Sequence, residues 1–306
     1  RSRRGGRAAR RAMREDSANA PVAMGSIKRN IPYTELCSAE GLDIIEANAQ
    51  TILREIGIDF KGDLEALDLW RNAGADVEGE RVRFPDGLVR SLLATAPATY
   101  VQHARNPARN VTFGGGNVIF APVYGPPFVH DLDHGRRYGT IADFENLVRL
   151  AYVAPHLHHS GGTVCEPVDI PVNKRHLDMV YAHMRLSDKP FMGSVTAPDR
   201  AADTVAMCEI LFGADFVAEN TVCTSLINVN SPMTFDEVML GALKTYARAG
   251  QAVIITPFIM SGAMAPVSVA GTLAQAMAEG MAGAALTQLI RPGAPVVFGL
   301  FAAALS

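Results

Sequence analysis

The chain has 306 residues, of which 48% are hydrophobic and 19% are charged. This composition is typical of a globular protein, long enough for one large α/β domain with an extra segment or for two domains. The formal net charge of −3 argues against non-specific nucleic-acid binding.

Cysteine usage and the first residues indicate the compartment. Cys37, Cys165, Cys208 and Cys223 are scattered without CxxC spacing, which in so long a chain predicts reduced, mostly buried thiols and a cytoplasmic location. The basic segment 1–16 lacks the apolar stretch of a secretory signal. No apolar run reaches the roughly 18 residues that cross a bilayer, so we expect no membrane partner.

The first third of the chain is expected to lie outside the main fold. Residues 1–33 form a basic arm, either a solvated tail or a strand that docks on a neighbouring subunit. Residues 34–135 form a helical and β-hairpin region. Apolar spacing and capping residues predict its helices from Ser38 to Gly57, from Asp63 to Gly74 and from Asp86 to Ala96. Its predicted strands are Tyr100–His103, Val111–Phe113 and Val118–Phe120.

From residue 136 to residue 306, helices alternate with short apolar strands. The predicted helices are Thr140–Ala154, Asn173–Leu186, Asp199–Phe212, Phe235–Ala249 and Thr272–Ile290. The predicted strands are His158–Thr163, Phe191–Val195, Thr221–Asn228, Ala252–Thr256 and Val296–Gly299. This alternation indicates right-handed βα crossovers and a parallel sheet.

Two arrangements fit this pattern, a closed (β/α)8 TIM-type barrel and an open doubly wound sheet. We favour the barrel, because no GxGxxG motif follows the first strand and polar residues collect at the carboxyl ends of several strands. We therefore predict an α/β fold, a (β/α)8 barrel with an N-terminal helical extension. Only about five of the eight strands that a barrel requires can be counted. Either the early hairpin region supplies further strands or the chain lacks its C-terminal part, and we expect the latter.

The last helix, Thr272–Ile290, is rich in alanine and almost free of charge. Helices of this kind are covered on both sides. We therefore expect it in the interior of the fold.

The carboxyl ends of the strands and one upstream loop supply the candidate site. These segments are short of charge and contain aromatic rings, amides, hydroxyls and a thioether. Such groups suit a quaternary ammonium, which cation–π contacts stabilise and which needs no general base. The candidate substrate-binding residues are Tyr124, Phe128, Glu166, Ser194, Asn228, Phe258, Met260, Ser261 and Phe301. No catalytic residue is assigned.

Several candidates could have a purely structural role instead of binding a substrate. Tyr124 and Phe128 could simply pack in their loop, and Glu166 could pair with a surface lysine or arginine. Met260 could fill the core. Asn228 is a safer candidate than Asn230, because Ser231-Pro232 is typical of a helix cap and first turn, and Asn230 could belong to that turn.

A metal site is the rival reading. His156, His158 and His159 lie near Cys165, and zinc prefers such ligands. His158 and His159 are adjacent on a predicted strand, so they should point to opposite faces, which disfavours a shared site. We therefore expect no metal. The run Asp131–Gly135 lacks the remaining ligands of a calcium loop and fits a hairpin turn better.

Several long stretches resemble the trimethylamine methyltransferase family. The most specific is SGAMAPVSVAGTLAQAMAEGMAGAALTQLIRPGAPVVFG, from Ser261 to Gly299. Further matching stretches are RRGGR at Arg3–Arg7, GLDIIEANAQTILREIGIDF, DLDHGRRYGTIADFENLVRLA and NSPMTFDEVMLGALKTYARAGQAVIITP. Together they span nearly the whole chain.

The resemblance implies a (β/α)8 barrel that moves a methyl group from a tri- or quaternary amine, of trimethylamine or glycine betaine type, to the cobalt of a separate corrinoid protein. It implies that this chain itself binds no cofactor tightly. We also expect a homo-oligomer. The alternatives are a non-catalytic barrel that binds quaternary amines and a metal-dependent barrel hydrolase.

Overall fold

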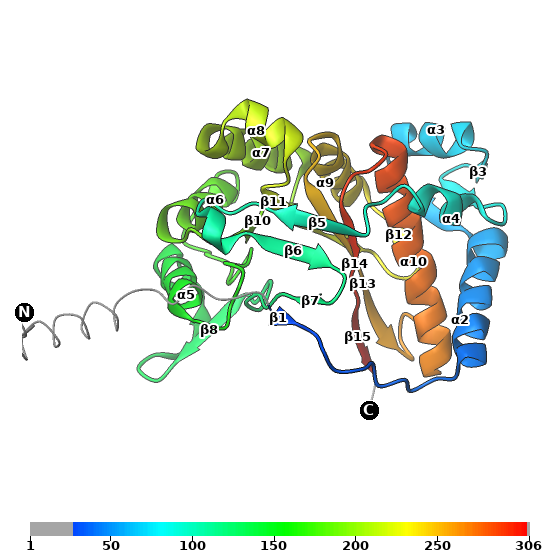
Figure 1. Ribbon diagram of the computed structural model, residues 1–306, viewed down its shortest axis with the longest axis horizontal. Helices are drawn as coiled ribbons and strands as arrows, with labels where there is room; N and C mark the ends of the chain where they lie inside the picture. The colour runs from blue at the N-terminus through cyan, green and yellow to red at the C-terminus, as the bar shows by residue number, and fades with distance from the viewer. Residues whose placement is uncertain (1–26, 305–306) are drawn as a thin grey trace, which may run out of the picture.

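The computed structural model describes residues 27–304 and shows a mixed α/β architecture around a parallel sheet (Figure 1). The sheet runs in the order β10 (Phe191–Met192), β11 (Cys223–Val229), β13 (Ala252–Ser261) and β14 (Val296–Phe298). All three pairings are parallel. The parallel sheet predicted from the alternating pattern is therefore present, while most of the basic arm lies outside the described residues.

The predicted helices of this half are also present, with shifted ends. They are α5 (Ile141–Val153), α6 (Arg175–Leu186), α7 (Pro198–Phe212), α9 (Glu237–Arg248) and α10 (Val269–Ile290), and a short α8 (Ala214–Glu219) follows α7. The predicted cap at Ser231-Pro232 is wrong, because α9 begins after Asp236, whose carboxylate accepts a hydrogen bond from the backbone of Met239. The intervening residues form the short strand β12 (Thr234–Phe235) instead.

Three predicted strands differ from the structure by more than two residues. Residues 158–163 form no assigned strand but run beside β10, since Ser160 donates to Pro190 O and Met192 donates to Gly161 O, each at 2.8 Å. The strand predicted at Phe191–Val195 has only two residues. In contrast, β13 continues to Ser261, because β15 (Phe301–Ala304) pairs with its second half.

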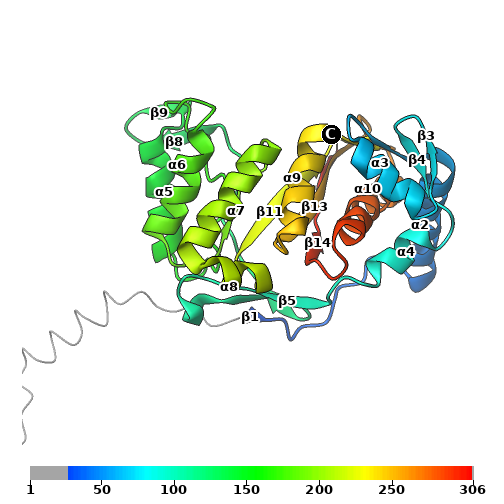
Figure 2. The ribbon, with the colours of Figure 1, turned by 90° about the horizontal axis from the view of Figure 1, so that it is seen from above.

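A hairpin covers the amino-terminal edge of the sheet. It consists of β5 (Thr99–Gln102) and β6 (Val111–Gly114), joined by a 3-10 turn at Pro107–Arg109. The side-chain amide of Gln102 donates to Phe191 O at 2.9 Å and to Val222 O at 3.3 Å, where β10 and β11 begin. A second hairpin, β8 (Phe128–Asp131) and β9 (Gly135–Tyr138), lies towards the opposite edge (Figure 2). The turn predicted at Asp131–Gly135 is therefore confirmed.

The N-terminal region contains a small mixed sheet that the sequence did not predict. It has the order β12, β2 (Ile58–Phe60), β4 (Arg81–Arg83) and β3 (Asp76–Glu78). The three predicted helices are α2 (Ala39–Thr51), which continues as one π-helical turn at Ile52–Ile56, α3 (Leu64–Asn72) and α4 (Leu88–Leu93). A further two-stranded pair joins β1 (Ile27–Lys28) to β7 (Asn117–Val118). The division of the chain at residues 33 and 135 stays a prediction.

Helix α10 is the centre of the core. It contacts α2, α3 and α4 on one side and α9, β13 and β14 on the other. Fifteen of its residues are buried, from Thr272 to Gln288, with Leu273 and Met277 as the partly exposed exceptions in that range. The expectation that this helix, which is almost free of charge, is covered on both sides is confirmed.

Close packing under α10 makes Gly283 sensitive to substitution. A Cβ at this position would lie 2.7 Å from Phe235 Cζ and 2.8 Å from Ile255 Cγ2. We expect Gly283→Ala to lower the free energy of unfolding by about 1–2 kcal/mol, because the overpacking outweighs the gain in helix propensity. Urea denaturation measures this change. Gly41→Ala in α2 is the matched control, since its nearest neighbour would be 3.5 Å away, and it should be neutral or stabilising.

The cysteines and the helices show two general features. Cys165, Cys208 and Cys223 are buried free thiols, whereas Cys37 is exposed, so the prediction of mostly buried thiols is confirmed.

Within residues 27–304, no helix combines the length and the apolar character required to span a membrane.

Candidate functional site

The carboxyl ends of β11 and β13 present two kinds of face. Val253 and Ile255 point into the core with the helices. The alternate residues of β13, Thr256, Phe258 and Met260, therefore point to the other face. Asn228 pairs with Thr256 across the ladder and shares that face. None of these four side chains on this face, Asn228, Thr256, Phe258 and Met260, is charged.

Two of the predicted residues meet on this face. Phe258 in β13 pairs in register with Phe301 in β15, and their rings stack with centroids 5.1 Å apart and planes 11° apart. The two side chains remain 48% and 60% exposed. Nearby, Thr256 Oγ1 is buried and has no hydrogen-bond partner among the described residues. Both rings of the stacked pair thus keep exposed surface.

Ser261 and Met260 follow Phe258 but differ in their surroundings. The Ser261 hydroxyl forms a 2.6 Å hydrogen bond with the Thr272 hydroxyl, which in turn donates to Pro266 O at 2.9 Å. Ser261 therefore joins the end of β13 to the start of α10 through the intervening loop. Met260 is partly exposed, so it is not the core filler of the alternative reading.

Three other predicted residues lie together in a separate cavity of about 60 Å³. Tyr124, Glu166 and Ser194 line it, with Met192 and His183 deeper in the fold. Burial raises the pKa of the Tyr124 hydroxyl, and a hydrogen bond with Thr163 opposes that shift. Sequence positions separated by 70 residues thus contribute to one cavity.

Glu166 does not offer a free charge to this cavity. Its carboxylate forms an ion pair with the guanidinium of Arg175, which also donates to Ile170 O at 2.9 and 3.1 Å. The alternative in which Glu166 pairs with a basic residue is therefore confirmed, although Arg175 is mostly buried rather than on the surface.

Phe128 lies apart from the cavity, on hairpin β8–β9. Its ring packs on Tyr138 with centroids 4.7 Å apart, and the Arg136 guanidinium lies 3.7 Å from its ring centroid. The structure therefore places Phe128 in local packing, as the alternative reading proposed for this residue.

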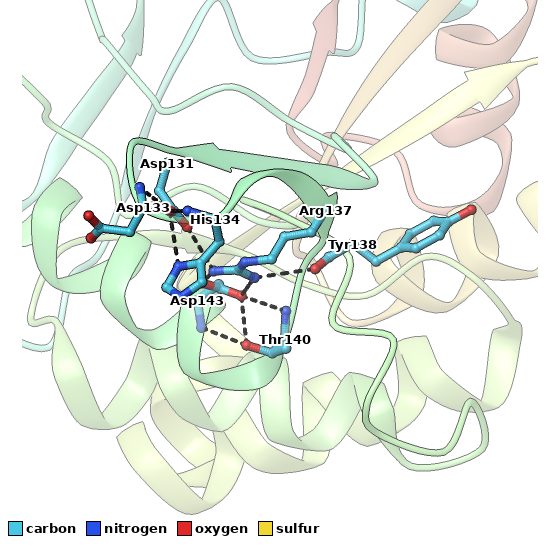
Figure 3. Close-up of polar contacts among 7 residues, drawn as sticks. All are labelled: Asp131, Asp133, His134, Arg137, Tyr138, Thr140 and Asp143. Carbon is cyan, nitrogen blue, oxygen red and sulfur yellow. Dashed lines mark hydrogen bonds and ion pairs between the residues drawn. The ribbon is translucent and has the colours of Figure 1, made fainter.

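The same hairpin is tied to α5 by a polar network (Figure 3). Arg137 donates to both carboxylate oxygens of Asp143 at 2.6 and 2.8 Å and to Asp131 at 3.1 Å. Thr140 and Asp143 form a capping box at the start of α5. The Arg137 guanidinium holds the pKa of Asp143 well below its usual range. Charge-assisted pairs of this kind fix the orientation of the hairpin.

A buried polar layer below the cavity was missed by sequence reasoning. His159 Nε2 lies 3.2 Å from Gln102 Oε1, which also accepts a 2.8 Å hydrogen bond from the Thr224 hydroxyl. His183 contacts the Ser160 hydroxyl at 2.7 Å and Gly162 O at 2.8 Å. Burial lowers the pKa of His159 to about 3 and that of His183 to about 4, so both are neutral at physiological pH.

A sequence signal for part of this layer does exist. His176, Met179, Val180 and His183 follow the i, i+3, i+4, i+7 spacing of one helix face, and all four line the cavity. The adjacent histidines His158 and His159 contact different partners, Phe120 and Gln102 respectively. Within the part of the chain that the structure describes, no group of three His, Cys, Asp or Glu residues could hold a metal ion.

Comparison with known proteins decides the family. The sequence model of the trimethylamine methyltransferase family (MTTB) matches residues 3–306. The chain belongs to the trimethylamine methyltransferase family. Both stretches that supply the candidate site, around Glu166 and around Phe258, lie inside the match.

Among curated relatives, the glycine betaine methyltransferase of Desulfitobacterium hafniense is 46% identical over 270 residues, which cover 88% of this chain and 56% of that protein. The proline betaine:corrinoid methyltransferase of Eubacterium limosum is 24% identical over 87% of this chain and 56% of its own length. The trimethylamine methyltransferase MttB of Desulfitobacterium hafniense is 26% identical over 86% and 53%. The chain thus spans about half the length of the family members that it matches.

Proposed function

We propose that the protein transfers a methyl group from a quaternary amine of the glycine betaine type to the cobalt of a corrinoid held by a separate protein. The reduced corrinoid supplies a cobalt nucleophile with the electron pair for the new bond to carbon. The broken C–N bond leaves its pair on nitrogen, and the amine departs as a neutral tertiary amine. Since this departure requires no proton, the site needs no acid–base pair.

The observation that carries the proposal is the exposed aromatic pair Phe258 and Phe301 on an uncharged face at the carboxyl ends of the strands. Aromatic ring faces attract a cation by about 0.5–2 kcal/mol each, depending on its desolvation. Asn228 and Thr256 supply only neutral polar groups beside them. Holding the ammonium here would direct one methyl group outward, where proximity and orientation to the cobalt provide the rate.

The fold supports the same proposal. In (β/α)8 barrels, the active site lies at the carboxyl ends of the strands. We propose that the parallel strands β10, β11, β13 and β14 form part of such a barrel. The order of these strands follows the chain, and each crossover contains a helix, as a barrel requires.

The partner and the cellular context belong to the proposal as well. Two of the matched relatives are named corrinoid methyltransferases, of proline betaine and of L-carnitine. A corrinoid protein is accordingly the proposed macromolecular partner. A cytoplasmic location and a homo-oligomeric state stay predictions, and analytical ultracentrifugation tests the latter.

Methyl transfer to free cob(I)alamin tests the function directly. With the natural full-length protein, we expect glycine betaine to methylate the cobalt, which the visible spectrum of the corrinoid reports. Dimethylglycine should accumulate in an amount equal to the methylated corrinoid. Binding of glycine betaine without transfer would instead identify a non-catalytic amine-binding protein. Hydrolytic activity that rises in proportion to bound metal, up to one metal ion per chain, would identify the metal-dependent barrel hydrolase instead.

A further inference from the structure

The cavity of about 60 Å³ extends along α6 towards the carboxyl edge of the sheet. His183 lies at its inner end, where Nε2 donates to Gly162 O at 2.8 Å. His176 lies seven residues earlier on the same helix, about 10 Å nearer to the edge at which α6 begins. The volume corresponds to roughly four water-sized groups. The cavity therefore accommodates one small polar group at the end of a larger ligand.

His176 offers an unpaired acceptor in the lining of this cavity. Its side chain is 6% exposed, and its Nε2 lies 2.8 Å from Asp203 Oδ2. Because a carboxylate only accepts hydrogen bonds, Nε2 carries the proton and Nδ1 carries the lone pair. Nδ1 is buried and has no hydrogen-bond partner among the described residues. Leaving a buried polar atom unpaired costs free energy, which a ligand group that donates to Nδ1 would restore.

Arg200, in the first turn of α7, offers donors to the same cavity. Its Nη1 donates to the Thr196 hydroxyl at 2.8 Å, and within residues 27–304 its guanidinium has no carboxylate at ion-pair distance. Since a guanidinium has several N–H groups, Arg200 keeps donors for a ligand. The other charged pair of the lining, Glu166 and Arg175, is internally neutralised.

The acceptor and the donors together define the chemistry of the ligand group. An anion would direct its lone pairs at the lone pair of His176 Nδ1, and a cation would be repelled by Arg200. The ligand group is therefore neutral and carries a donor next to an acceptor, as a primary carboxamide does. A quaternary betaine has no N–H or O–H group and cannot pair with Nδ1. A corrin ring carries primary carboxamides at the ends of its side arms.

We infer that this cavity binds a primary carboxamide of the corrin periphery, whose N–H group donates to His176 Nδ1 and whose carbonyl accepts from the Arg200 guanidinium. The choice of a corrin as the source of the carboxamide rests on the proposed function. The chain then contacts the corrin ring itself, in addition to the protein that carries it.

The position of the cavity fits a wide ring better than a betaine. Met192 in the lining pairs with Thr224, and Thr224 pairs with Ala252, which lies six residues before Phe258 on β13. This inner level of the cavity is thus about 20 Å along the strands from Phe258, and β10 and β13 are about 10 Å apart across the sheet. A betaine is too short to reach from the aromatic pair even to the outer end of the cavity at His176, whereas a corrin ring with extended side arms is much wider.

Binding of dicyanocobinamide to the natural full-length protein tests the inference without turnover. Cyanide occupies both axial positions of the cobalt, so equilibrium dialysis measures only contacts to the ring and its arms. We expect cobyrinic acid heptamethyl ester, whose arms accept hydrogen bonds but cannot donate them, to bind at least about tenfold more weakly. Excess acetamide should displace the cobinamide, whereas N,N-dimethylacetamide, which has no N–H group, should not.

Variants of the two polar residues locate the effect in this cavity. Arg200→Met and His176→Phe should each weaken cobinamide binding by about tenfold. His176→Phe should change the affinity for the ester by less than about twofold, because the ester has no donor for Nδ1. Arg71→Met removes a charge from α3 and is the control, for which both affinities should be unchanged. If His176→Phe fails to fold, the two acetamides and the two corrinoids still decide the question with the wild type.

The outcomes separate this inference from the proposed function. Equal affinities for cobinamide and the ester, equal competition by the two acetamides, or an unchanged affinity in Arg200→Met would each overturn the inference, even where methyl transfer from glycine betaine occurs. If acetamide binds through His176 and Arg200 but cobinamide does not displace it, the corrin is the wrong source and the inference fails. If cobinamide binds as expected while no methyl transfer occurs, the carboxamide site stands and the proposed function fails.

Discussion

Replacing Phe258 with alanine is expected to lower kcat/KM for methyl transfer from glycine betaine by about five- to thirtyfold, the equivalent of about 1–2 kcal/mol of lost cation–π attraction. The ring is 48% exposed on the face that we assign to the ammonium group, so its loss should leave the core intact. Steady-state kinetics with cob(I)alamin as acceptor measure the change.

Phe301→Ala tests the other half of the pair. Because the rings stack at 5.1 Å, each one orients the other, and the double variant should lose less than the sum of the two single effects. Phe258→Leu separates the ring from its apolar surface, since it preserves apolar area but removes the π-face.

The control for these variants is Phe120→Ala. Phe120 is 49% exposed and packs on His158, away from the aromatic pair, so its removal should not alter the kinetics. A second control uses the ligand: an isosteric tert-butyl carboxylate lacks the positive nitrogen and should bind much more weakly than glycine betaine. Equal affinity for the two compounds, or no effect of Phe258→Ala, would contradict a cation–π site.

Replacing Glu279 with alanine is expected to lower the free energy of unfolding by about 3 kcal/mol, because it removes the acceptor of three buried or part-buried hydrogen bonds and leaves a cavity in α10. The Glu279 carboxylate in α10 accepts hydrogen bonds from the Ser231 hydroxyl at 2.5 Å, from Met233 N at 2.9 Å and from the Gln275 side-chain amide at 2.9 Å. These bonds hold the segment that follows Asn228. Urea denaturation of the full-length protein measures the loss, and a fall in kcat/KM should accompany it.

Glu279→Gln is the matched control, since the amide preserves the size and most of the hydrogen bonds, and it should cost less than about 1 kcal/mol. The pH dependence gives a second check. Burial raises the pKa of Glu279 above its ordinary value of 4.5. A raised folded-state pKa means that the contribution of Glu279 to stability is fully present below pH 4.5 and is lost as the pH rises through the folded-state pKa. The stability of the wild type relative to Glu279→Gln should therefore fall over that range, and a constant difference would contradict the assignment.

Much of the fold follows from local patterns, and the exceptions have a common cause. The alternation of helices and apolar strands and the burial of α10 both match the structure. The sheet β12–β2–β4–β3 could not be predicted, because its strands have only two or three residues each and β12 pairs with β2 from a distant part of the chain. Such short strands have no periodicity of their own and exist only through their partners.

The candidate site shows the same division. Aromatic and hydroxyl residues after successive strands indicated the carboxyl edge, and Phe258 and Phe301 do meet there. The turn predicted at Asp131–Gly135 already implies the pairing of Phe128 with Tyr138. The sequence left open whether Glu166 pairs with a basic residue, and only the structure identifies Arg175 as its partner.

The sequence by itself determined the family of this protein, the order of its helices and strands, and the segments that end at the carboxyl edge of its sheet. These properties depend on residues a few positions apart, so spacing and motifs are sufficient to infer them. Only the tertiary structure decided which of these segments share a cavity, which charges cancel there and which polar atoms remain without a partner. Those properties depend on distances between elements that pack together from distant parts of the chain, and a linear pattern contains no record of such distances.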